Sequence, residues 1–258
     1  MSTQIENVRK DVRMRNESDP MMSNAWLLVY LIPVFAIIIG IGAIFLAALG
    51  MMLFPMDGAG FAPLLFGIFL IPLLLLVGFI VSLILIYKLI KRRNTHFKRQ
   101  QFLLDDIVKA AKTIAEKKGV DAEVGLSSCE RTVREAKAEE TEKGAMLWAI
   151  LSAIIFIAEW YINYFLMKDF YKHERREDGF WEDLSKVLDK CGIKFSAPRR
   201  SVILPNRSFV LYLILSIITL GLFRIYWLYV LLNDPNEHFK YHIQIEDQLL
   251  STLESAKL

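Results

Sequence analysis

The sequence predicts an all-α integral membrane protein, with a transmembrane helical hairpin, two further apolar helices that span or re-enter, and cytoplasmic amphipathic helices. Hydrophobic residues make up 54% of the 258 residues although 23% are charged, so the apolar residues must be clustered. They gather in apolar runs as long as a membrane-crossing helix. Similar polar passages follow three of these runs, which predicts a three-fold internal repeat.

The runs 25–54 and 61–87 predict the transmembrane hairpin. Neither contains a charged residue, and each exceeds the roughly 20 residues that a helix needs to cross about 30 Å of hydrocarbon. Between them, the Pro and Gly residues of PMDGAG at 55–60 predict a tight turn. Small residues recur at helical spacing in the first run, at Gly40, Ala43, Ala47 and Gly50. Such a stripe lets another helix approach closely.

The runs 145–167 and 209–232 are also long enough to span, but each contains one charge, Glu159 in the first and Arg224 in the second. Because a charge at that depth costs about 2.5–3.5 kcal/mol, we expect the two residues to form an intramembrane charge pair. The alternative is that each faces water or headgroups. Gly221 is typical of a turn and favours re-entry of the second run, whereas the first contains neither Gly nor Pro.

Basic residues after the run 61–87 predict the orientation of the chain. Six occur without an intervening acid: Lys88, Lys91, Arg92, Arg93, Lys98 and Arg99. The positive-inside rule therefore places this end and the N-terminus on the cytoplasmic side of the cell membrane. We expect lipid-headgroup contacts from five of them, Lys91, Arg92, Arg93, Lys98 and Arg99. A crossing by 145–167 violates the rule, because 168–207 would lie outside with ten Lys and Arg residues.

A tyrosine and a histidine recur at one spacing in the three polar passages. The tyrosines are Tyr87, Tyr164 and Tyr229, and the histidines that follow nine residues later are His96, His173 and His238. These repeat positions follow apolar runs, so we expect both residue types at the membrane interface.

The histidines are also the candidate metal ligands of the chain. The three repeat histidines can converge around one axis. In each passage, however, a carboxylate lies nine residues after the histidine, which is the opposite face of a helix at 100° per residue. His238 and His242 have a ligand spacing without a third ligand nearby. We therefore expect no metal and no cofactor.

Each polar passage leads into an amphipathic helix. The apolar faces are Leu103, Ile107, Ala111 and Ile114 in the first helix, Phe180, Leu184, Val187, Leu188 and Cys191 in the second, and Ile245, Leu249 and Leu253 in the third. Asp234, Pro235 and Glu237 predict a new helix start before the third. Because each face needs a neighbour or the membrane surface, we expect a homo-oligomer or a subunit of a membrane complex.

The chain divides into five segments by these signals. They are a polar N-terminal cytoplasmic segment (1–24), the transmembrane hairpin (25–91), a cytoplasmic helical insertion (92–144), and two membrane units with amphipathic exit helices (145–200 and 201–258). A net charge of only +3 gives no signal for nucleic-acid binding. Cys129 and Cys191 lie in no CxxC motif, which favours free thiols in a reducing compartment.

The sequence contains no Gly-rich phosphate loop, nucleophile–base motif or HExxH motif, so we do not expect an enzyme. We expect a non-catalytic multi-pass membrane protein that acts as an oligomeric scaffold or complex subunit through its cytoplasmic helices, with the lipid bilayer as its surroundings. The alternative is an ion channel or transporter that uses Glu159 and Arg224.

The last quarter of the chain resembles a widespread prokaryotic membrane family, domain of unknown function 4234. The residues that carry the resemblance are Thr219, Leu220 and Gly221, Tyr226 and Trp227, Tyr229, and Asn233 and Asp234. The resemblance covers 207–238 and its surroundings, and it implies membrane residence without a known chemistry.

Overall fold

The computed structural model describes residues 2–53 and 61–256, and every regular element in these ranges is a helix. In chain order the elements are α1 (Ser2–Arg13), α2 (Arg15–Ser18), the 3-10 helix η1 (Asn24–Tyr30), α3 (Leu31–Leu53), α4 (Phe61–Lys118), α5 (Glu123–Glu139), α6 (Ala145–Ile154), α7 (Phe156–Lys190), α8 (Phe209–Ile218) and α9 (Phe223–Ser255). The turn predicted at 55–60 lies outside the described residues. In the described ranges the all-helical prediction is confirmed.

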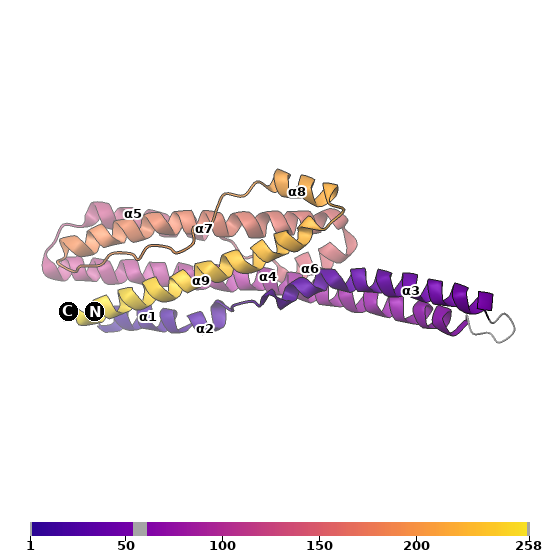
Figure 1. Cartoon of the computed structure of the whole chain (residues 1–258). Helices are drawn as coiled ribbons and strands as arrows, with labels where there is room; N and C mark the ends of the chain where they lie inside the picture. The colour runs from indigo at the N-terminus through magenta and orange to yellow at the C-terminus, as the bar shows by residue number, and fades with distance from the viewer. Residues whose placement is uncertain (1, 54–60, 257–258) are drawn as a thin grey trace.

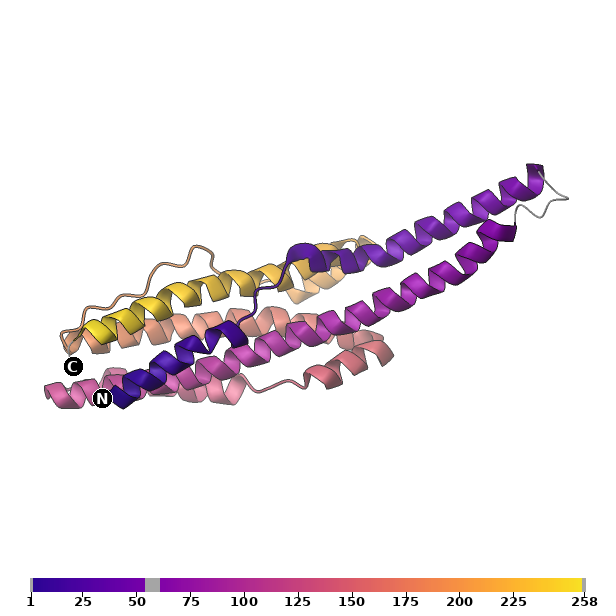
Figure 2. The same ribbon diagram turned by 90° about the horizontal axis from the view of Figure 1, so that it is seen from below.

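A long pair of helices projects from one end of the molecule (Figure 1, Figure 2). It consists of α3 and the first half of α4. α4 continues past the projection for a total of 58 residues, which is about 87 Å at 1.5 Å per residue. α3, together with η1 before it, and α4 are both long and apolar enough to cross a membrane.

Small residues line the contact between these two helices. The buried residues of α3 are Ala36, Gly40, Ala43 and Ala47, which includes most of the predicted stripe. A Cβ atom added to Gly67 would lie 3.0 Å from the Cβ of Ala43, and one added to Gly40 would lie 2.8 Å from Cδ1 of Ile71. The two helices therefore approach too closely to admit larger side chains without a shift.

Large apolar side chains of the projecting helices point outward instead. Ile41 is 65% exposed, Phe45 66% and Phe69 74%. A surface of this kind is unusual for a protein in water, where large contiguous apolar patches mark contact with a partner or a membrane.

The other end of the molecule is a bundle in which α4, α7 and α9 pass through the same three layers (Figure 1). An apolar layer lies nearest the projection and includes Leu89 of α4, Phe165 of α7 and Trp227 of α9. A polar layer follows, and a second apolar layer fills the far end, where α1 and α5 also pack. Buried charges are therefore enclosed between two apolar layers.

Neither of the apolar runs 145–167 and 209–232 forms one continuous helix. The first breaks at Ile155, whose backbone is extended between α6 and α7. The ring centroids of Trp148 and Phe165 are nevertheless only 5.9 Å apart, whereas 17 residues of straight helix would span about 25 Å. The chain has therefore reversed direction between them.

The run 209–232 reverses in the same way. Gly221 has a φ of +93°, in the region that glycine adopts readily, and the rings of Tyr212 and Trp227 lie 5.2 Å apart across the turn. Each run therefore forms two short helical segments that fold back on each other, rather than one continuous helix. The turn at Gly221 was predicted; the break at Ile155, without Gly or Pro, was not.

The three predicted apolar faces pack against one another within the chain. Their residues form one buried core, to which α1 adds Val8 and Val12. Gly192, with a φ of +70°, ends α7 as a C-terminal cap. The homo-oligomer prediction was motivated by unpartnered apolar faces, and this packing removes that motive.

The predicted helix start at Asp234 is wrong, because α9 continues through Pro235. Proline has no N–H to donate to the carbonyl four residues earlier, which belongs to Leu231. Arg92 Nη2 donates to that carbonyl oxygen at 2.8 Å. A side chain from α4 therefore satisfies the acceptor that the proline leaves open. α4 likewise runs without a break across the predicted boundary at 91–92.

Candidate metal centre

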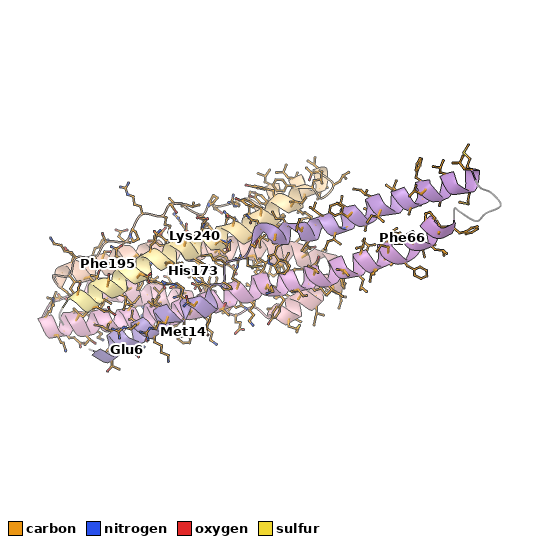
Figure 3. The ribbon with its side chains drawn as sticks, turned by 60° about the horizontal axis from the view of Figure 1, so that its bottom comes forward. Glu6, Met14, Phe66, His173, Phe195 and Lys240 are labelled. Atoms are coloured by element: carbon orange, nitrogen blue, oxygen red, sulfur yellow. The ribbon has the colours of Figure 1, made fainter. Side chains whose placement is uncertain are left out.

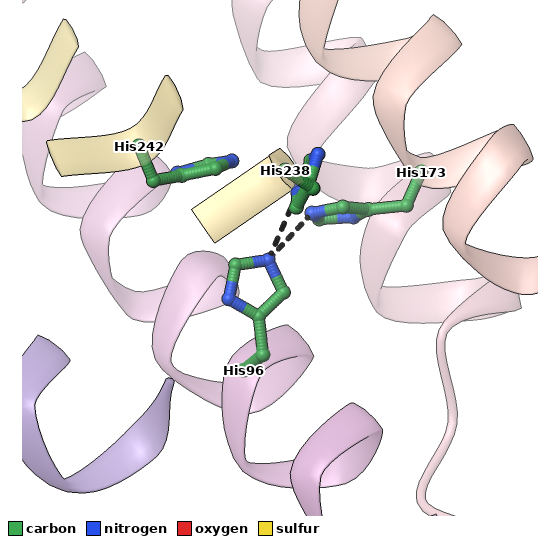
Figure 4. A group of neighbouring side chains, drawn as sticks. All are labelled: His96, His173, His238 and His242. Carbon is green, nitrogen blue, oxygen red and sulfur yellow. Dashed lines mark hydrogen bonds between the residues drawn. The ribbon is translucent and has the colours of Figure 1, made fainter. Parts of the chain in front are cut away.

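All four histidines of the chain meet in the polar layer (Figure 4). They come from three helices: α4 supplies His96, α7 supplies His173, and α9 supplies His238 and His242. His96 Nε2 lies 3.2 Å from His173 Nε2 and 3.1 Å from His238 Nε2. One ligand atom from each of the four rings can be chosen so that all lie within 4.8 Å of one another.

Helix geometry places a carboxylate among these rings. Glu177 follows His173 by one turn of α7, so both side chains lie on one helix face. Glu177 Oε1 lies 3.1 Å from His173 Nε2, and Glu177 Oε2 lies 2.9 Å from His242 Nε2. The same oxygen lies 3.7 Å from His238 Nε2. Glu177 is therefore a fifth candidate ligand at the same point.

The outward nitrogen of every ring faces a carboxylate. The Nδ1 atoms lie 3.0 Å from Asp19 for His96, 2.8 Å from Glu140 for His173, 3.5 Å from Glu174 for His238, and 2.9 Å from Glu246 for His242. An Nδ1–H that points to a carboxylate leaves the lone pair of Nε2 directed inward. Metal-binding histidines are commonly oriented by this arrangement, which also makes the ligand nitrogen more basic.

Arginines neutralise the outer carboxylates. Arg99, 1% exposed, lies 2.7 Å from Asp19 and 2.9 Å from Glu246. Arg176 pairs with Glu140, and Arg200 lies 3.3 Å from Glu174. These pairs fix the carboxylates, and the carboxylates in turn fix the rings.

The surroundings shift the pKa values of the rings in opposite directions. Burial lowers the pKa of His96 to about 4, although Asp19 opposes the shift. Burial also lowers the pKa of His173, but Glu140 and Glu177 outweigh it and raise the value to about 10. His238 follows His96, because burial and the neighbouring His242 lower its pKa. The pKa of His242 is raised despite burial, because of Glu177 and Glu246.

The inward nitrogens can be accommodated in two ways. Two unprotonated Nε2 atoms at 3.1–3.2 Å repel each other unless a cation or a proton lies between them. Two nitrogens on one tetrahedral Zn²⁺ at about 2.0–2.1 Å stand about 3.3–3.4 Å apart, close to the distances found. The cluster can therefore hold shared protons or one metal ion, and the nitrogen spacing fits the ion.

Apolar rings pack directly against the histidine cluster. Phe97, Phe170 and Phe239 are buried together with Leu204. The ring centroids of Phe239 and His96 are 4.6 Å apart, and those of Phe97 and His173 are 4.4 Å apart. Because all four histidines are at most 1% exposed, water has no direct contact with the candidate ligands.

The structure corrects the interfacial placement of the histidines and part of the headgroup prediction. His96, His173 and His238 are buried inside the bundle. Arg93 and Arg99 are 1% exposed and pair with carboxylates inside the bundle, so they are not available for headgroups. Arg92 is also buried and donates to the Leu231 carbonyl. Lys91 and Lys98 are exposed.

The other repeat residue, tyrosine, faces outward. Tyr164 and Tyr229 are each 38% exposed, and Tyr87 is half-buried. A separation of nine residues is half a rotation beyond two full helical turns, so tyrosines outside accompany histidines inside on all three helices. The three tyrosines thus share one setting.

Glu159 and Arg224 are in contact in the structure, at the starts of α7 and α9. The Tyr30 hydroxyl lies 3.4 Å from Glu159, and the Arg224 guanidinium stacks 5.2 Å from the Tyr30 ring. Glu159 lies in the first turn of α7, where the helix dipole favours a carboxylate. The pair also lines a cavity of about 310 Å³ beside α4.

Sequence reasoning missed most of this candidate metal centre. It considered the carboxylates nine residues after each histidine, whereas those at the centre follow by one or four residues, as Glu174 and Glu177 follow His173. The signal was present in the one-turn spacing of His173 with Glu177 and of His238, His242 and Glu246. Asp19 and Glu140 lie outside the main helices and left no local signal.

Comparison with known proteins identifies the C-terminal part of the chain. Residues 207–250, which include His238, His242 and Glu246, match a family described as Domain of unknown function (DUF4234). No curated protein and no solved structure matches the chain. The predicted resemblance to this family is confirmed over residues 207–250.

Proposed function

We propose that this protein is a membrane-anchored helical bundle that binds one divalent transition-metal ion through His96, His173, His238, His242 and Glu177. The observation that carries the proposal is the convergence of the four rings, each of which has a carboxylate oxygen within 3.5 Å of its Nδ1 atom. A chance cluster of buried histidines has no reason to place every ring in this one orientation.

The ligand types favour a transition metal over Mg²⁺ or Ca²⁺. Imidazole nitrogens suit Zn²⁺, Fe²⁺, Ni²⁺ and Cu²⁺, whereas Mg²⁺ and Ca²⁺ select oxygen ligands. Two ligands of one ion at about 2.1 Å cannot be more than about 4.2 Å apart, and the candidate atoms already lie within 4.8 Å. A contraction of about 0.6 Å across the widest pair completes the coordination shell.

The role of the ion is structural in this proposal. Every candidate ligand is at most 1% exposed, so a substrate has no route to an open coordination position. The ion would join α4, α7 and α9 at one point, and through Asp19 it would also hold the segment that leads into η1 and α3. A structural metal contributes its binding free energy to folding.

Membrane anchoring is supported by two helices that are long and apolar enough to cross a membrane, with large side chains facing outward. The short α6 and α8 lie at the end of the bundle from which this pair projects (Figure 1). We place the bundle in the cytoplasm, because the basic residues after the apolar part of α4 predict that orientation. The scaffold function stays a prediction, as does the transporter alternative that uses Glu159 and Arg224.

The metal content of the purified full chain tests the proposal. The protein is extracted in mild detergent without chelator, and bound metals are quantified by mass spectrometry. We expect about one transition-metal ion per chain. The double variant His173→Asn/His242→Asn removes two ligands from different helices and should retain less than a tenth of the metal. Far-UV circular dichroism establishes that the variant is still helical.

A matched control separates histidine from thiol ligation. Cys129→Ala/Cys191→Ala removes both cysteines of the chain and should leave the metal content unchanged. Chelator-stripped protein is also titrated with Co²⁺, whose visible absorption should lack a thiolate charge-transfer band. Failure of the wild-type chain to bind Zn²⁺, Fe²⁺, Ni²⁺, Cu²⁺ or Co²⁺ in that titration would overturn the proposal.

A further inference from the structure

A second polar site lies where the projecting helices join the bundle. A cavity of about 490 Å³ is bounded by the segment that precedes α3 and by one face of α4. Its lining includes Trp26, Lys88, Lys91, Arg92 and Thr95, with Glu17 as its single carboxylate.

Positive charge dominates this cavity. Lys88, Lys91 and Arg92 contribute three cations against the one carboxylate of Glu17. Within the part of the chain that the structure describes, none of the three cations lies within 4.0 Å of a carboxylate. Other arginines of this stretch differ, since Arg93 lies 2.7 Å from Asp169.

Arg92 is the most costly of the three charges, because it is buried. Its side chain is only 2% exposed and donates to the carbonyls of Leu231 and Leu232 and to Asn236, which are all neutral. Its Nε–H has no hydrogen-bond partner among the residues that the structure describes. Buried guanidinium groups are otherwise found with a compensating anion, and none is supplied by the described protein groups.

The cavity also lies at the boundary of the apolar region. The charge-free part of α4 ends at Tyr87, one residue before Lys88. The Lys88 ammonium lies 5.9 Å from the ring of Trp26, and that of Lys91 lies 5.7 Å from the ring of Tyr87. Trp and Tyr rings beside Lys at the end of an apolar helix are typical of the headgroup level of a bilayer.

We propose that this cavity binds a phosphate group, and that in the membrane the group is the headgroup phosphate of an anionic phospholipid. Lys88 and Lys91 reach the phosphate from the surface, Arg92 supplies a fixed positive charge behind them, and the Thr95 hydroxyl lines the same wall. The site replaces the broader basic patch predicted from sequence, because Arg93 and Arg99 are already paired inside the bundle.

Lipid retention by the detergent-solubilised full chain tests this site. Native mass spectrometry measures the binding of phosphatidylglycerol, of phosphatidylcholine and of inorganic phosphate. The double variant Lys88→Gln/Lys91→Gln changes two exposed side chains, so the fold should persist. Because each basic residue near an anionic surface contributes about 1 kcal/mol, we expect phosphatidylglycerol binding to weaken about tenfold or more.

Controls separate site binding from general charge attraction. Lys172→Gln/Lys194→Gln removes the same charge at exposed positions away from the cavity and should leave lipid binding unchanged. The metal content of both variants should equal that of the wild type, which separates this site from the histidine centre.

Each outcome bears on the proposal. Selective loss of phosphatidylglycerol in Lys88→Gln/Lys91→Gln supports it. Displacement of the lipid by millimolar inorganic phosphate supports phosphate recognition and assigns the site to soluble phosphate. Equal loss in the control variant, or equal binding of phosphatidylglycerol and phosphatidylcholine by the wild type, overturns it.

Discussion

The two halves of α4 bury and expose opposite kinds of residue, although they form one continuous helix. In 61–87 the buried positions include Gly67 and Gly78, while large apolar side chains such as Phe66 are exposed (Figure 3). In 88–118 the buried positions include Arg93 and His96, and lysines such as Lys98 are exposed. One half is apolar outside, and the other carries charge inside.

The difference shows how the surroundings decide what a helix buries. Apolar surface faces outward only where the surroundings are themselves apolar, and two helices then gain by close approach through small residues. A charge can be buried only where partners are fixed around it, as Arg99 is fixed between Asp19 and Glu246. The comparison therefore predicts that the projecting half tolerates outward-facing apolar side chains but not charges, and that the bundle half tolerates buried charges as long as their partners are present.

The largest expected effect comes from breaking the buried charges. Arg99→Met leaves the carboxylates of Asp19 and Glu246 buried without their cation, which we expect to cost about 3–5 kcal/mol of unfolding free energy. Denaturant unfolding of the detergent-solubilised chain, followed by circular dichroism, measures the loss.

An exposed arginine supplies the control for that prediction. Arg134, whose side chain is 66% exposed, lies 3.7 Å from Glu130 on α5. Surface ion pairs of this kind contribute little, so Arg134→Met should change the unfolding free energy by less than about 0.5 kcal/mol. Equal effects of the two substitutions would mean that the charges of the polar layer are not held as described.

The next largest effect should come from a charge placed on the outer surface, because the projecting helices and the bundle should respond to it differently. Ile41 of α3 is 65% exposed and Ile243 of α9 is 40% exposed. Ile41→Lys places an ammonium in the proposed hydrocarbon region at a cost of about 2.5–3.5 kcal/mol, whereas Ile243→Lys faces water and should be nearly neutral. Resistance to carbonate extraction from membranes measures the difference.

The matched substitution Ile41→Leu keeps the apolar character and should leave extraction unchanged. If Ile41→Lys remains in the membrane as firmly as Ile41→Leu does, the projecting helices do not lie in hydrocarbon.

Local patterns predicted the parts of this fold that depend on local physics. Apolar runs predicted the two long apolar helices, and one-turn periodicity predicted the apolar faces that pack in the second apolar layer. Both signals lie within one segment of the sequence. The histidine cluster could not be predicted in this way, since His96 and His173 are 77 positions apart and Asp19 lies in neither helix. The prediction that Arg93 contacts headgroups failed for the same reason. Its partner in the structure, Asp169, is distant in the sequence.

The smallest effect concerns a carboxyl group that the bundle buries without a partner. Asp11 of α1 is 7% exposed, and its Oδ2 has no hydrogen-bond partner. Burial, together with the charge of Asp106, raises the pKa of Asp11 to about 6, although Arg99 opposes the shift. In the unfolded chain the value is about 3.9, so the folded state binds this proton more tightly.

Folding stability should therefore fall as the pH rises from about 4 to about 6, and the full cost should persist above that range. Asp11→Asn removes the charge and should increase the unfolding free energy by about 1–2 kcal/mol at pH 7.5, with no gain over the wild type at pH 4. Asp105→Asn is the control, because Asp105 already has Lys109 at 2.8 Å and Lys137 at 3.0 Å, and it should show no such pH-dependent gain. A gain for Asp11→Asn that is the same at both pH values would contradict the burial of an ionised carboxylate, since only the charged form is penalised in the folded bundle.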